Sequence, residues 1–138
     1  MRVMGLDLGE KTIGIAVSDP MGWTAQGVEI IRRAGNIESE IQRLKELIAQ
    51  YGVNLILLGL PKNMNGSIGE QGQKTIDYAG VLRERLGLPV ELWDERLSTA
   101  AAGRALLEAD MSRAKRKKVI DKVAAAYILQ GYLDSRGQ

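Results

Sequence analysis

The sequence contains no cysteine, no histidine and no phenylalanine. Without cysteine, the chain can form no disulfide, no thiolate metal site and no cysteine nucleophile. Without histidine, it lacks the usual general base of serine hydrolases and the nitrogen ligand of most zinc sites. Its chemistry must therefore come from carboxylates, lysine, arginine, hydroxyls or amides, or from a metal ion held by oxygen atoms.

Long apolar segments and aromatic residues are also scarce. No stretch approaches the roughly 20 apolar residues of a membrane-spanning helix, and the N-terminus has no basic segment followed by a cleavage site. We therefore expect a cytoplasmic protein with no membrane partner. Aromatic residues make up only 4% of the chain, which argues against a protein that reads single strands by stacking bases.

What the sequence does contain is typical of an ordinary globular protein. Hydrophobic residues make up 45% and charged residues 26% of its 138 residues. That length suits one domain, and that composition is enough to bury a core without disulfides or structural metals. We expect a single domain over residues 1–138.

The hydrophobic pattern predicts strands first and then alternating helices and strands. Strands are expected at residues 2–8, 12–18, 25–32, 53–58 and 89–93, and helices at 37–51, from 67 or 68 to 86, from 98 or 99 to 109, and from about 117 to 133. A three-strand meander followed by βαβ units indicates an α/β fold, with one mixed five-stranded sheet and helices on both faces.

Asp7 lies within the first predicted strand, where aspartate is disfavoured. The same face carries Val3, Gly5 and, just beyond, Gly9, and glycines leave open space where a metal ion or a phosphate can approach. An edge-strand aspartate that faces water, or one that caps the turn, is the alternative. We favour a functional role for Asp7.

Asp121 lies on the last predicted helix, in line with Ala125, Ile128 and Tyr132. This spacing puts the four residues on one face, which is expected to face the sheet. A carboxylate at the end of such a stripe is costly unless it is paired or binds a metal. A salt bridge to a neighbouring lysine, or a favourable position near a helix N-terminus, is the alternative.

Asp94 and Glu95 follow the apolar end of the fifth predicted strand. Consecutive strand residues point to opposite faces, so only one of the two can join Asp7 and Asp121. The other is left to bind Arg96 or a loop amide, and a solvated strand end is the alternative for both.

Carboxylates gathered from a sheet and a helix suit Mg²⁺ or Mn²⁺, which prefer oxygen ligands. Such ions can activate water against a phosphodiester.

Two further segments suggest contact with a polyanion. Five cations lie within six residues, and subtracting them from the net charge of +2 leaves −3 for the rest of the chain. A solvated surface loop is the alternative for this basic segment. The central loop offers donors just before a helix N-terminus, an arrangement that suits phosphate, whereas a flexible turn-rich loop is its alternative. The predicted nucleic-acid-binding residues are Lys62, Asn63, Asn65, Arg113, Lys115, Arg116, Lys117 and Lys118.

Four segments, in this order, resemble the motifs of the YqgF/RuvX family. They are GLDLGEKTIGIAVSD at residues 5–19, GLPKNMNGS at 59–67, DERLST at 94–99, and IDKVAA with ILQ and YL within 120–133. The resemblance covers nearly the whole chain and implies an RNase H-like fold with strand order 3-2-1-4-5. Members of the family are described as Holliday junction resolvases or as nucleases that mature the 5′ end of pre-16S rRNA.

The resemblance also implies roles for individual residues. Asp7, Glu95 and Asp121 match the family's acidic positions, which makes them the implied metal-binding catalytic set, with Asp94 as the other candidate ligand. The related resolvase RuvC carries two acids three residues apart on its last helix. Ala124 stands at the second of those positions here, which favours RNA processing over junction resolution.

We therefore expect a nuclease that uses Mg²⁺ or Mn²⁺, acts on pre-rRNA within a ribosomal precursor particle, and is a monomer or homodimer. One alternative is a Holliday junction resolvase that acts on branched DNA. Another is a non-catalytic RNA-binding assembly factor. An ATP-binding protein of the actin and sugar-kinase type would need two such domains, and 138 residues have room for one.

Overall fold

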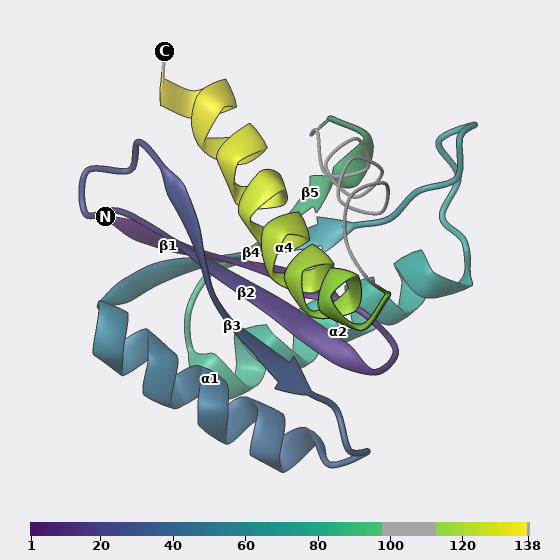
Figure 1. Cartoon of the computed structure of the whole chain (residues 1–138), viewed down its shortest axis with the longest axis horizontal. Coiled ribbons are helices and arrows are strands. Elements are labelled where there is room, and N and C mark those ends of the chain that lie inside the picture. Colours follow the sequence, from purple (N-terminus) through teal and green to yellow (C-terminus); the bar gives the residue numbers. More distant parts are fainter. Residues whose placement is uncertain (98–112, 138) are drawn as a thin grey trace.

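A five-stranded mixed sheet forms the centre of the computed structural model, which describes residues 1–97 and 113–137 (Figure 1). The strands are β1 (Arg2–Leu8), β2 (Thr12–Ser18), β3 (Ala25–Arg32), β4 (Val53–Leu60) and β5 (Val90–Asp94). Their order is β3-β2-β1-β4-β5. β1 pairs antiparallel with β2 and parallel with β4, and β5 is parallel to β4. This confirms the expected sheet and its order.

Helices cover both faces of this sheet. α1 (Ile37–Tyr51) and α2 (Glu70–Leu86) lie on one face, and α4 (Arg113–Gly137) lies on the other (Figure 1). Two apolar cores result, one under α1 and α2 and one under α4. α1 has the predicted bounds because Asn36 caps its first turn and Gly52, with a φ of 67°, ends it in the left-handed conformation.

Some predicted bounds were wrong. β4 continues through Gly59 and Leu60, because these residues pair with Trp93 and Asp94 of β5. α2 begins at Glu70 rather than near Ser67. The basic segment, expected before the last helix, belongs to α4 from Arg113 onward, since lysine, arginine and alanine are all good helix formers. The predicted helix from 98 or 99 to 109 lies outside the described residues.

The glycine beside Asp7 plays a different part from the one expected. A β-carbon on Gly5 would lie 2.9 Å from Cβ of Leu129 and 3.3 Å from the carbonyl oxygen of Ala125. Gly5 therefore leaves no open space. Its missing side chain is what lets α4 pack directly against β1.

Gln130 fixes the direction in which α4 crosses the sheet. Its Oε1 accepts a hydrogen bond of 2.9 Å from the backbone N–H of Ala25, and its Nε2 donates one of 3.0 Å to the carbonyl of Trp23. The C-terminal half of α4 therefore lies where β3 begins. Its N-terminal half lies over the opposite end of the sheet, where β1 ends (Figure 1).

Candidate active site

Asp7 lies near the end of β1, on the face that α4 covers. Val3 and Gly5 share this face by alternation and both pack under α4, whereas Leu6 and Leu8 point into the opposite core. Asp7 pairs with Gly14 of β2 and is half-buried. Its carboxylate thus lies at the C-terminal edge of β1, just beyond the part of the strand that packs against α4.

Glu95 begins the short 3₁₀ turn Glu95–Leu97, directly after β5. Its side chain reaches back over β4, because its Oε1 lies 3.1 Å from the position that a β-carbon on Gly59 would occupy. Ile128 of α4 contacts the same position at 2.7 Å, so Glu95 lies on the α4 face. β4 separates β5 from β1, a gap of about 10 Å over two strand spacings. Because the Glu95 side chain extends over Gly59, its carboxylate lies closer to β1 than the backbone of β5 does.

Asp94 is held by its own neighbours. Its carboxylate accepts hydrogen bonds from the backbone N–H of Arg96 at 2.9 Å and from Nη2 of Arg96 at 2.8 Å, and Nζ of Lys62 lies 3.7 Å away. The hydrogen bonds from the Arg96 side chain, with the charge of Lys62 adding to them, lower the pKa of Asp94 to about 2. Of the acidic pair, Asp94 is therefore the residue that binds Arg96, and Glu95 is the one that reaches across β4.

Asp121 lies in α4, one turn before Ala125, and its side chain is outside the described part of the structure. Ala125, Ile128 and Tyr132 are buried, which confirms that their stripe faces the sheet. Ala124 is buried as well, with 1% of its surface exposed. Among the side chains that are described, no three acidic groups come close enough together to hold a metal ion.

The central loop is tied together by its own polar side chains. The Nδ2 of Asn63 donates to Oγ of Ser67 at 2.9 Å, and Oδ1 of Asn65 accepts from the same hydroxyl at 2.6 Å. Arg96 Nη1 donates a long hydrogen bond of 3.5 Å to the carbonyl of Met64. Two of these hydrogen bonds close the loop on itself, and the long one from Arg96 joins it to the residues that follow β5. Lys62 lies at the same edge. The side chains of the basic segment are outside the described part.

One buried polar cluster was missed by the sequence analysis. Glu40 of α1 is only 2% exposed and binds Arg33 and Tyr78 on the face of the sheet away from α4. A signal was present, because Glu40 precedes the core residues Leu44 and Leu47 at helical spacing.

The sheet order and its helical cover define an RNase H-like fold, which solved resolvases share. Thermus thermophilus RuvC, in complex with a Holliday junction substrate, aligns with a TM-score of 0.58 and 14% identity, over 99% of this chain and 97% of that one. The Holliday junction resolvase of fowlpox virus aligns with a TM-score of 0.55 and 18% identity, over 98% and 99% of the two chains. At these identities the likeness concerns the fold alone.

Sequence comparison assigns the family. The model of the RuvX family, described as Holliday junction resolvase, matches residues 1–135, and this chain belongs to that family. A relative from Desulforamulus reducens is 60% identical over 98% of both chains. Relatives from Moorella thermoacetica and Clostridium novyi are 59% and 58% identical, over 98% or more of each chain. All three carry the provisional name pre-16S rRNA nuclease.

None of the described helices combines the length and the apolar character needed to span a bilayer.

Proposed function

We propose that this chain is a metal-dependent nuclease that matures the 5′ end of pre-16S rRNA. The observation that carries this proposal is the position of the Glu95 side chain over Gly59. It brings a second carboxylate to the face and the edge of the sheet where Asp7 lies. The provisional name of the relatives supplies the RNA substrate, and the family supplies the phosphodiester chemistry.

Asp7, Glu95 and Asp121 would hold the divalent cation. These side chains offer only oxygen ligands, which suit Mg²⁺ or Mn²⁺. The missing side chain at Gly59 leaves room for the Glu95 carboxylate on this face. Asp121 precedes Ala125 by one turn, and Ala125 packs on Gly5, two residues before Asp7. When bound, the cation would lower the pKa of a water molecule and stabilise the leaving oxygen of the phosphodiester.

The remaining residues of the proposed site bind and orient the nucleic acid. Lys62, Asn63 and Asn65 lie at the edge where β5 ends. The cations of the basic segment, Arg113 and Lys115 to Lys118, precede Asp121 by three to eight residues on α4. At 1.5 Å of rise per residue, that places them within about 12 Å of Asp121 along the helix. A nucleic-acid strand held by this basic segment therefore passes close to the proposed metal-binding acids. We place this activity in the cytoplasm, on a ribosomal precursor particle, with a monomer or a homodimer as the active form.

Cleavage of a defined RNA tests this proposal. The purified chain, supplied with Mg²⁺ or Mn²⁺, should cut an RNA that joins the 5′ leader to 16S sequence, and the new 5′ end should map to the mature position. Asp7→Asn, Glu95→Gln and Asp121→Asn should each abolish the cut. Asp134→Asn, an exposed carboxylate at the far end of α4, is the matched control and should retain it. Equal cleavage by Asp7→Asn would refute the assignment.

Junction resolution is the second candidate, because the matching family model is described by that activity. The same preparations should be offered a four-way DNA junction with symmetric cut sites. Paired cuts in the junction by a dimer, with no cut in the RNA, would favour the resolvase. Salt-dependent RNA binding that survives Asp7→Asn, without cleavage by the wild type, would favour a non-catalytic assembly factor.

A further inference from the structure

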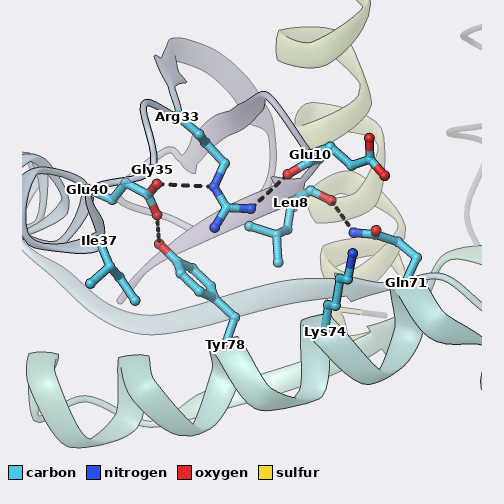
Figure 2. A pocket seen from close by; sticks show the side chains of 10 residues that line it. Leu8, Glu10, Arg33, Gly35, Ile37, Glu40, Gln71, Lys74 and Tyr78 are labelled. Carbon is cyan, nitrogen blue, oxygen red and sulfur yellow. Dashed lines mark hydrogen bonds and ion pairs between the residues drawn. The ribbon is translucent and has the colours of Figure 1, made fainter.

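A pocket of about 490 Å³ opens at the C-terminal edge of β1, on the face of the sheet opposite to Glu95 (Figure 2). Leu8 and Gly9 form its wall at the end of β1, and α1 and α2 contribute its sides. Asp7 and Leu8 are neighbours on one strand and point to opposite faces. The pocket and the proposed catalytic acids therefore lie on the two sides of the same sheet edge.

A buried network fixes one wall of this pocket. The carboxylate of Glu40 accepts hydrogen bonds from Nε of Arg33 at 3.1 Å and from the hydroxyl of Tyr78 at 2.9 Å. The Arg33 guanidinium lies over the Tyr78 ring at 5.3 Å from its centroid, and its Nη1 donates to the carbonyl of Gly9 at 2.8 Å. Arg33 neutralises the buried acid and is itself held in one orientation, so it needs little rearrangement to meet a ligand.

Two donors, on Arg33 and Lys74, remain available in the pocket, which the Glu10 carboxylate also lines. Among the described residues, Nη2 of Arg33 makes no hydrogen bond. Lys74 pairs with Glu70 only at 3.7 Å, and both side chains are more than half exposed, so this ion pair holds Lys74 weakly. Figure 2 shows Arg33 and Lys74 pointing into the pocket, while the Glu10 carboxylate is directed away from Lys74. Glu10 and Glu40 balance the formal charge of the lining. What the pocket offers an anionic group is therefore the local pair of donors at Lys74 and Arg33.

We propose that this pocket is a second phosphate subsite, in which Lys74 and Arg33 bind a backbone phosphate of the nucleic-acid strand near the cleaved bond. This inference rests on the proposed function, because the strand is the substrate. Leu8 lies one residue from Asp7, about 3.3 Å along the strand. A nucleic-acid strand that bends around the turn after β1 therefore meets the acids on one face of the sheet and the pocket on the other face. A free phosphate or mononucleotide offers the same chemistry, and the experiment separates the two sources.

Salt-dependent binding without turnover is the decisive measurement. A labelled RNA that spans the cleavage site is titrated, without metal and at several salt concentrations, with the wild type and with Lys74→Gln. Lys45→Gln, an exposed lysine of α1 outside the pocket, is the matched control. Loss of one phosphate contact should reduce the slope of log affinity against log salt by about 0.7 for single-stranded RNA. We expect this for Lys74→Gln, with no change for Lys45→Gln and a restored slope for Lys74→Arg.

Two outcomes would overturn the inference. One is a slope for Lys74→Gln equal to that of both the wild type and Lys45→Gln. In the other, inorganic phosphate or adenosine monophosphate raises the melting temperature of the wild type but not that of Lys74→Gln, while the RNA slope is the same for both proteins. That result would assign the pocket to a free anion. The slope comparison measures binding alone. A wild type that fails to cut RNA in the separate cleavage assay would therefore count against the proposed nuclease, and the slope comparison would stay valid.

Discussion

The Glu95 carboxylate lies over Gly59, with Oε1 3.1 Å from the position of the missing β-carbon. Glu95 comes from the turn after β5, whereas Asp7 lies on β1, and β4 runs between them. Any side chain at position 59 would point into the path that Glu95 takes across β4. Gly59 is therefore a determinant of the site geometry, although it carries no chemical group of its own.

Gly59→Ala should impair the site more than the fold. The new methyl group would approach Cδ1 of Ile128, the flexible end of a side chain, and would also displace Glu95. Overpacking of this kind costs about 1–3 kcal/mol of stability. We expect metal-dependent cleavage to fall and the Mn²⁺ concentration needed for half-maximal rate to rise. Rates measured across a Mn²⁺ titration, beside urea unfolding, check this. Full activity at an unchanged Mn²⁺ requirement would contradict it.

The two neighbouring acids should respond differently to loss of charge. Glu95→Gln removes a proposed ligand and should lower cleavage by more than the roughly 10–100-fold that outer partners of a metal site contribute. Asp94→Asn weakens the contact with Arg96 and should cost less than Glu95→Gln. Cleavage rates of the two variants, measured at saturating metal, provide the comparison. A larger loss for Asp94→Asn would reverse the assignment.

Acid should weaken the fold through Asp94. Its pKa is lowered from the ordinary value of 3.8 to about 2 by the side-chain hydrogen bonds of Arg96. A carboxyl group whose pKa is lower in the folded state than in the unfolded state stabilises the fold at pH values above its unfolded-state pKa. This stabilisation is lost as the pH falls through about 2. The difference in unfolding free energy between the wild type and Asp94→Asn should be constant near neutral pH and shrink from about pH 4 toward pH 2. Urea unfolding across that range tests this. A difference that does not change with pH would exclude the contact as its cause.

Two glycine substitutions should have opposite effects on stability. Gly5→Ala would push against Leu129 and the α4 backbone, and should destabilise the fold by about 1–3 kcal/mol. Gly80→Ala adds a methyl group to an exposed position of α2 with open space around it. It should stabilise by about 0.4–1 kcal/mol, because alanine restricts the unfolded chain. Urea unfolding of the two variants measures both. Similar stabilities would show that α4 does not pack on Gly5 this closely.

Local pattern was sufficient to predict much of the fold. The first three strands and α1 have the predicted bounds, because alternation and caps such as Asn36 and Gly52 act over a few residues. The end of β4 was missed because glycine and proline indicate a loop, and only pairing with Trp93 on a distant strand extends it. The helical start of α4 was missed because lysines and arginines suit a solvated loop as well as a helix.

The site was predictable only in part, for a similar reason. Alternation along β1 put Asp7 on the face of Val3 and Gly5, and in the structure these two residues pack under α4. The path of Glu95 over Gly59 depends on a contact between different strands, which no local pattern encodes. The partnership of Glu40 with Tyr78 spans 38 residues. Spacing within α1 could indicate that Glu40 is buried, but it could not identify the partner.

Within the described residues, α4 is the helix that covers the core containing Val3, Ala16 and Leu57, and Gln130 secures it to the backbone around Trp23 and Ala25. A ribosome makes the chain from its N-terminus, so β1 emerges first, and α4, which covers it, emerges last. Until α4 arrives, the nascent sheet presents an uncovered apolar face, the kind of surface on which chains aggregate. A stop codon before α4 should therefore yield insoluble product, even though every strand has been synthesised.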